Sequence, residues 1–353
     1  MSVIFAILLF SLLIFIHELG HFTAAKLSGV QVNEFSMFMG PALWKKQVGE
    51  TLYTIRCIPI GGYCAMEGED GGSDNPRAFD KAAWWKRLII LAAGAAMNFL
   101  IGVLLMVIVY LPVKQTIIPV IASFENYATV NGEDGLQTGD RILAVDGEKL
   151  YSYSDLSLIL SLNPGDIHDL VVERGGERVV LKNFLLEKHE ITAEDGTTVR
   201  RFGMNFTLHT PSFGQKLGLA WNQSLDTVRM VRLSLQMLLT GKVGLKDMSG
   251  PVGIVSEMSN VAAASDSWVS ALLNMLYFGG FIAINLAVMN LLPIPALDGG
   301  RIVCLLITAL VEAVTKKKIN PKYEGYLHSV GMLLLLGLMA VIMLKDVIFL
   351  FKR

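Results

Sequence analysis

Four long apolar segments constrain the fold of this protein more than any other feature of its sequence. They cover residues 2–26, 88–111, 268–292 and 326–344, and each is long enough to cross a bilayer as a helix. The sequence is 53% hydrophobic and 17% charged, whereas soluble domains are about 25% charged. It therefore predicts an α-helical polytopic membrane protein with four transmembrane helices. A shorter apolar run, residues 302–311, is predicted to form a buried or interfacial helix.

The first segment ends in the sequence His17-Glu18-Leu19-Gly20-His21. On a helix the two histidines lie at i and i+4 on one face, where both imidazoles can bind one zinc ion. Glu18 can then act as general base on a water activated by that zinc. In a soluble helix these residues could form a solvated face, but the flanking Phe15 and Phe22 offer little polar surface. Ionisable groups at membrane depth are costly, so the motif favours a zinc site at the membrane.

A catalytic zinc usually has three protein ligands and a water, so a third ligand is needed. Asp298 is the only acidic residue between Asp266 and Glu312, and it ends the run Asn290-Leu-Leu-Pro293-Ile-Pro295-Ala-Leu-Asp298. The prolines end a helix, and the following Gly-Gly pair allows close approach of the backbone. Asp298 could instead cap the next helix or pair with Arg301. We expect it to be the third zinc ligand.

Charge and cysteine content exclude two other classes of protein. With 30 Lys and Arg against 31 Asp and Glu, the net charge of −1 gives no case for nucleic acid binding. The three cysteines, Cys57, Cys64 and Cys304, do not suggest a disulfide scaffold. The spacing of Cys57 and Cys64 matches no zinc signature, so both are expected to be ordinary thiols.

Between the second and third apolar segments lies a small β-rich domain. Short strands are expected at residues 141–145, 169–173 and 178–182, and a short helix at residues 155–162. The segment Gly135-Leu-x-x-Gly-Asp-x-Ile-x-x-Val-Asp-Gly147 resembles part of a PDZ domain. A generic β-hairpin is the alternative. PDZ domains bind extended peptides, often the C-termini of other proteins, by adding a strand to a sheet edge, which implies a polypeptide partner.

Two further polar regions flank the membrane segments. Residues 212–248 have apolar side chains at helical spacing, and this amphipathic helix could lie on the lipid surface or pack on the β domain. In the loop of residues 27–87, strand-like stretches surround Gly61-Gly62. This loop could form a β element that dips towards the membrane beside the zinc. Its edge could pair with an unfolded substrate segment.

The orientation in the membrane follows from the positive charges of the short loops. The loop after the first segment and the loop before the last are rich in basic residues: Lys45, Lys46, Arg56, Lys81, Lys86, Arg87, Lys316, Lys317, Lys318 and Lys322. Both loops should be cytoplasmic, which places the PDZ-like loop outside. Lys352 and Arg353 mildly oppose this orientation.

Taken together, these motifs resemble the site-2 protease family of intramembrane zinc metalloproteases. The resemblance rests on the His17-Glu18-x-x-His21 motif, the Asn290-x-x-Pro-x-Pro-x-x-Asp298-Gly motif and the PDZ insertion. The stretches at residues 35–44 and 58–63 resemble the family's membrane-re-entrant β loop, and Gly94-x-x-x-Asn98 its motif in the second span. Residues 250–254 resemble the segment before its third span. The sequence has room for one PDZ domain, as in the shorter bacterial members.

The resemblance implies a role for each motif. His17, His21 and Asp298 would bind Zn²⁺, and Glu18 would be the catalytic base. Asn290, and with it Asn98, would hold or polarise the substrate backbone. Two prolines, Pro293 and Pro295, and two glycines, Gly61 and Gly62, would also contact the substrate backbone.

The resemblance also implies a domain order, a location and a class of substrate. In order, there would be the first transmembrane helix with the zinc motif (1–27), a cytoplasmic and re-entrant β loop (28–87), the second helix (88–113), the PDZ domain (114–210), juxtamembrane amphipathic helices (211–262) and the last two spans with the third ligand (263–353). The protein would lie in the bacterial cytoplasmic membrane, with the active site near its cytoplasmic side. Its partners would be membrane lipid and single-span proteins, such as anti-sigma factors or signal-peptide remnants, cut in regulated intramembrane proteolysis.

Two functions from other classes compete with a protease. A catalytically silent membrane adaptor could use the PDZ-like domain to recruit the ends of other proteins, but it would not need Glu18. A metal transporter could use His17, His21 and Asp298 as a transit site, but the PDZ-like domain and the re-entrant loop count against it.

Overall fold

The structure is a computed structural model. It describes all residues except 1, 70–71, 126–129, 131, 133–134, 164, 193–197, 242, 245–249, 251–252, 255, 257–259, 262–264, 266, 317–321 and 352–353. The protein divides into two compact units, which are treated separately below. The first combines Met1–Met106 with Thr227–Arg353, and the second is Val107–Asp226.

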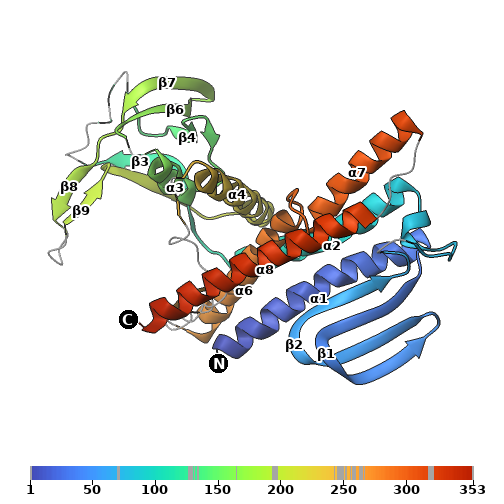
Figure 1. The fold of residues 1–353 in the computed structure, drawn as a ribbon. Helices are drawn as coiled ribbons and strands as arrows, with labels where there is room; N and C mark the ends of the chain where they lie inside the picture. The colour runs from blue at the N-terminus through green and yellow to red at the C-terminus, as the bar shows by residue number, and fades with distance from the viewer. Residues whose placement is uncertain are drawn as a thin grey trace. The chain divides into compact units, whose positions relative to one another are not determined.

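Four helices among the described residues are long and apolar enough to cross a membrane. They are α1 (Ser2–Ser28), α2 (Trp84–Tyr110), α6 (Trp268–Asn290) and α8 (Lys322–Phe351), labelled in Figure 1. The prediction of a four-span helical membrane protein is thus confirmed. The short apolar run falls in α7 (Asp298–Thr315), whose N-terminus follows the loop after α6.

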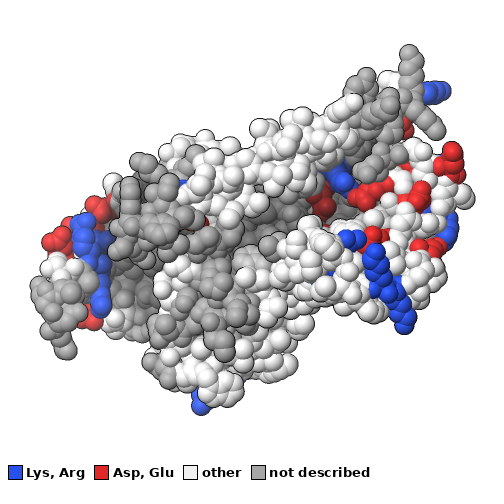
Figure 2. Space-filling model, turned by 60° about the horizontal axis from the view of Figure 1, so that its bottom comes forward, with Lys and Arg blue, Asp and Glu red and all other residues white. Residues whose placement is uncertain are grey.

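Glycines let three of these helices approach one another closely. A Cβ on Gly20 of α1 would lie 2.8 Å from the carbonyl carbon of Ala93 in α2. A Cβ on Gly102 of α2 would lie 3.1 Å from the carbonyl oxygen of Gly280 in α6. Small residues of this kind are typical of helix contacts in lipid, where backbones pack closely. The wide uncharged stretches on the face shown in Figure 2 also suit a protein surrounded by lipid.

The predicted strand-like loop forms a sheet from two long strands, β1 (Val32–Val48) and β2 (Thr51–Met66). Both strands fold back on themselves, so residues 32–37 pair with residues 62–66 on one side and with residues 52–55 on the other. Residues 42–48 pair with residues 51–56. Residues 62–66 therefore form one edge of this sheet among the described strands, and we call them the 62–66 edge.

The sheet has one face packed on α1 and a distal part that is apolar and exposed. Phe22 of α1 and Phe35 of β1 stack with ring centroids 4.8 Å apart, and Phe35 and Cys64 are buried in the same core. Large apolar side chains of the sheet remain exposed: Met39, Leu43, Trp44, Val48, Ile55 and Ile58. Arg56 is satisfied within the sheet by Glu34, Tyr63, Ser36 and the Gly40 carbonyl.

The second unit is built on an antiparallel sheet in the order β10-β3-β4-β6-β7, with β5 paired to β4. Its elements are β3 (Thr116–Phe124), β4 (Arg141–Val145), β5 (Glu148–Lys149), α3 (Ser154–Leu162), β6 (Ile167–Arg174), β7 (Glu177–Leu185), β8 (His189–Thr192), β9 (Thr198–Arg201) and β10 (Met204–His209). The three predicted strands lie on β4, β6 and β7, and the predicted helix is α3. Buried apolar side chains of these elements form one core.

The Gly139-Asp140 and Asp146-Gly147 turns hold this sheet together. The Asp140 carboxylate is 1% exposed and accepts hydrogen bonds from Arg174 Nε at 2.8 Å and Nη2 at 2.7 Å. Burial would raise the pKa of the Asp146 carboxyl, but hydrogen bonds from His168 and the Asp169 amide lower it below its usual value. The motif that suggested a PDZ domain therefore contributes buried polar contacts to the sheet.

The amphipathic helix is shorter than predicted. Helix α4 spans Phe213–Leu239 instead of continuing to residue 248. Gly241 has φ +70°, the left-handed conformation that commonly ends a helix, and its amide donates to the Leu238 carbonyl. Residues 242 and 245–249, at the end of the predicted helix, lie outside the described residues.

Candidate metal centre

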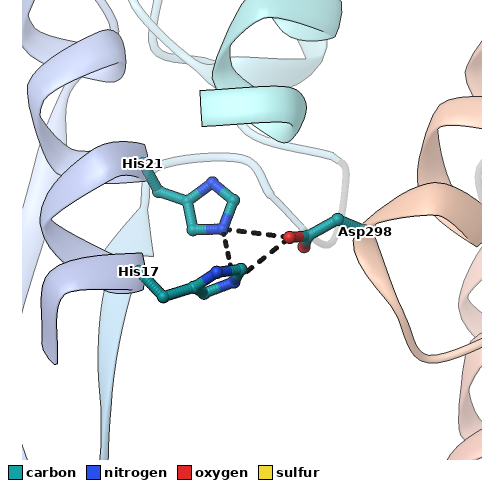
Figure 3. A group of neighbouring side chains, drawn as sticks. All are labelled: His17, His21 and Asp298. Carbon is teal, nitrogen blue, oxygen red and sulfur yellow. Dashed lines mark hydrogen bonds and ion pairs between the residues drawn. The ribbon is translucent and has the colours of Figure 1, made fainter. Parts of the chain in front are cut away.

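Helix α1 presents both motif histidines on one face, as the spacing predicts. His17 and His21 are 9% and 7% exposed, and their Nε2 atoms lie 3.1 Å apart. Figure 3 shows the two rings side by side, pointing away from α1 towards Asp298. A helix places side chains four residues apart on the same face. The spacing of the two histidines in the motif is therefore enough to bring their rings together.

Asp298 completes the group from the N-terminus of α7. Its Oδ2 lies 3.1 Å from His17 Nε2 and 3.4 Å from His21 Nε2. The backbone before it turns tightly, because a Cβ on Gly300 would lie 2.8 Å from the carbonyl carbon of Ile294. Gly300 thus lets the loop pack against the first turn of α7, from which Asp298 reaches the histidines.

Hydrogen-bond partners of the two Nδ1 atoms orient the rings so that the Nε2 atoms face Asp298. His21 Nδ1 lies 2.8 Å from the Ile90 carbonyl of α2, which can only accept, so in the neutral ring Nδ1 carries the proton and Nε2 has the lone pair. His17 Nδ1 lies 3.4 Å from the Asn290 side-chain amide. A half-turn of that amide exchanges its oxygen and nitrogen, so Asn290 can accept a proton donated by Nδ1. Such outer partners orient metal-binding imidazoles.

The three facing atoms fit a zinc ion. Asp298 Oδ2 is buried, and the two histidine Nε2 atoms are the partners that the described residues offer it. The ligand atoms of His17, His21 and Asp298 all lie within 4.8 Å of one another. Ligands about 2.1 Å from a tetrahedral zinc lie about 3.4 Å apart, close to the observed separations. Two imidazoles and a carboxylate are also ligands that zinc commonly takes.

Gly94 of α2 supports the rings of both histidines. A Cβ at this position would lie 2.7 Å from His17 Cε1 and 2.8 Å from His21 Cε1. Such contacts are shorter than side chains tolerate, so even a methyl group would push the rings apart. Gly94 therefore lies at the floor of the candidate centre.

Gly94→Ala should therefore weaken zinc binding while the membrane helices still fold. Displacing both rings should lower zinc affinity by about 10- to 100-fold, comparable to loss of an outer-shell partner. Zinc competition with a chromogenic chelator measures this. Ala96→Val, which adds bulk to an exposed position of the same helix, should bind zinc as the wild type does. Equal affinity of the Gly94 variant and the wild type would contradict the close packing of the rings.

Glu18 lies next to the 62–66 edge. A Cβ on Gly62 would lie 3.7 Å from Glu18 Cγ and 2.9 Å from the Ser36 carbonyl oxygen. No described residue forms a hydrogen bond or ion pair with the Glu18 carboxylate. Glu18 directly follows His17 in α1, and its carboxylate is thus available to a water molecule.

The remaining predicted residues differ in how close they come to this group. Asn98 is 1% exposed in α2, and its Oδ1 has no hydrogen-bond partner among the described residues. Pro295 packs against α8, Gly61 lies against Met39, and Pro293 is exposed. The structure thus places Asn290 against His17 and Gly62 against Glu18, whereas the contacts of Gly61 are with Met39.

Comparison with known proteins identifies the class of this centre. The model of peptidase family M50 matches residues 5–338. The chain belongs to this family. It is 34% identical over 351 residues, 99% of both proteins, to a candidate zinc metalloprotease of Clostridium perfringens. It is 27% identical, over 98% of both proteins, to the regulator of sigma-W protease RasP of Bacillus subtilis.

As an M50 peptidase, the protein is a membrane-embedded zinc metalloprotease. Membership in this family favours the enzyme over the adaptor and the transporter.

Sequence patterns alone gave no role to Ile90 and did not predict the contact of Gly94 with the rings. Their spacing could have indicated a shared role, because Ile90, Gly94 and Asn98 are four residues apart and lie on one face of α2.

Proposed function

We propose that this M50 peptidase hydrolyses peptide bonds inside the transmembrane segments of single-span membrane proteins. His17, His21 and Asp298 would hold the zinc, and Glu18 would be the general base. The observation that supports this most directly is the position of the motif. All three α1 residues of the motif lie within Ile7–Ser28, a candidate membrane span, where a metal site would meet membrane-embedded substrates.

The roles of the side chains follow from their positions. When bound, zinc supplies a Lewis acid that activates a water and offsets negative charge developing on the substrate carbonyl. Glu18 takes the proton of the attacking water and passes it to the leaving amine. The contact with His17 supports an orienting role for Asn290. The near-complete burial of Asn98 argues against its touching the substrate.

The substrate must unwind first, because a helix hides its carbonyls in internal hydrogen bonds. The 62–66 edge offers an unwound segment a strand to pair with, and Gly62 in this edge lies beside Glu18. Strand addition of this kind replaces the hydrogen bonds that the helix loses. The exposed apolar side chains of β1 and β2 support a sheet that reaches into lipid.

The location and the substrates are inferred from charge and relatives. Basic short loops favour a cytoplasmic position for the β1–β2 loop and an outer position for the second unit. The second unit would act as a PDZ domain that admits trimmed substrates or holds their terminal residues. The name of the Bacillus relative, a regulator of a sigma factor, supports anti-sigma factors as substrates, with signal-peptide remnants as a further class.

A reporter substrate tests this function. The purified protein, in liposomes with zinc, is given a single-span protein with a short outer stub, and products are mapped by mass spectrometry. We expect a cut within the membrane span, and none with the Glu18→Gln variant. We also expect helix-breaking residues in the span to speed cleavage, because unwinding becomes easier. Cleavage confined to segments outside the membrane would contradict the proposal.

A further inference from the structure

Helix α8 is the most peripheral of the four candidate spans. Only 6% of its Gly325–Asp346 window is buried, against 33% for each of the other three. Most of its side chains, including Leu333 and Leu334 at 71% exposure, face outwards. Even so, one turn of α8 makes close contacts with the loop that carries Asp298.

That turn contains His328 and Gly331. His328 Nδ1 accepts a hydrogen bond from the backbone amide of Ala296, with an N–N distance of 2.9 Å. A Cβ on Gly331 would lie 2.8 Å from both the carbonyl carbon and the carbonyl oxygen of Pro295. The absence of a side chain at Gly331 lets α8 approach, and His328 then reaches the amide.

The residue that His328 contacts is held in an unusual conformation. Ala296 has φ +78°, a left-handed value that non-glycine residues adopt rarely and that persists only when the surroundings hold it. The bond from the Ala296 amide to His328 is one such restraint from another helix. Asp298 follows two residues later, so the direction of the backbone at Ala296 determines where the Asp298 carboxylate points.

We propose that His328 is a positioning residue for the metal centre, fixing the Ala296 amide so that Asp298 reaches the two histidines. Gly331 serves the same purpose by letting α8 lie against Pro295. This inference rests on the proposed role of Asp298 as a metal ligand. It gives the peripheral α8 a function beyond crossing the membrane.

Zinc affinity of the purified full-length protein, measured by chelator competition in detergent, tests this inference. His328→Leu keeps most of the volume but removes the acceptor, so affinity should fall by about 10- to 100-fold. His328→Asn should restore affinity close to wild type, because its Oδ1 stands near the position of Nδ1 and can accept from Ala296. A merely structural role would not distinguish the two variants in this way.

Gly331→Ala is the second probe, and it remains decisive if His328→Leu does not fold. It should lower zinc affinity, whereas Gly337→Ala should not, because a Cβ at Gly337 meets no atom within 4 Å. The inference is overturned if folded His328→Leu binds zinc like wild type, if His328→Asn is as weak as His328→Leu, or if Gly331→Ala matches Gly337→Ala. Asp298→Asn is the reference: wild-type affinity in that variant would overturn the ligand role itself, whatever the His328 variants show.

Discussion

Glu18→Gln should stop cleavage of a transmembrane reporter while the protein keeps its zinc. The amide is nearly the same size as the carboxylate but cannot take a proton from water. General base catalysis contributes about 10²- to 10⁴-fold, so cleavage should fall by at least about 100-fold. Zinc content should not change, because the atoms proposed to bind the metal belong to His17, His21 and Asp298. Zinc per protein molecule and cleavage rate are measured on the same preparation.

A matched control separates this effect from a loss of charge. Glu187→Gln makes the same change at an exposed position of the second unit and should leave both readouts at wild-type values. Cleavage by Glu18→Gln at the wild-type rate would remove Glu18 from the mechanism. Loss of zinc in that variant would instead show that Glu18 helps to bind the metal.

Asp298→Asn should remove both zinc and activity. The substitution keeps the shape of the side chain but replaces the anionic oxygen, 3.1 Å from His17 Nε2, with a neutral amide. Zinc sites rarely use such amides. Loss of a direct ligand should exceed the 10- to 100-fold cost of losing an outer partner, so affinity should fall by more than about 100-fold. Chelator competition gives the affinity, and the reporter gives the activity.

Glu312→Gln provides the control for this variant. It removes a carboxylate from the same helix α7, near its C-terminal end, and should bind zinc as the wild type does. Full zinc affinity in Asp298→Asn would exclude Asp298 from the ligand set and leave the group with two imidazoles.

The sequence alone predicts much of this architecture, because membrane spans and metal sites require particular residue types at particular spacings. A span needs a long apolar run, and four such runs appear on α1, α2, α6 and α8. The i, i+4 spacing of His17 and His21 specifies a shared face of one helix. Asp298 could be singled out because it is the lone acid in a long apolar region, although only the fold shows that it reaches the histidines.

Other features depend on contacts between distant segments and could not be read from local patterns. Strands β1 and β2 each fold back on themselves within one sheet. This arrangement depends on the pairing of residues 34–37 with residues 62–65 on one side and 52–55 on the other. The helix predicted for residues 212–248 ends at Leu239, because a left-handed Gly241 follows. The contact of His328 with Ala296 joins α8 to the loop before α7, 32 residues earlier in the sequence.

X-ray absorption at the zinc edge of the purified wild-type protein tests the role of His17, His21 and Asp298 most directly. We expect a first shell of nitrogen and oxygen only, at about 2.0–2.2 Å, with two imidazoles, and the loss of this spectrum in Asp298→Asn. Sulfur at about 2.3 Å would contradict this ligand set, because it contains no thiol and would then have to include a cysteine.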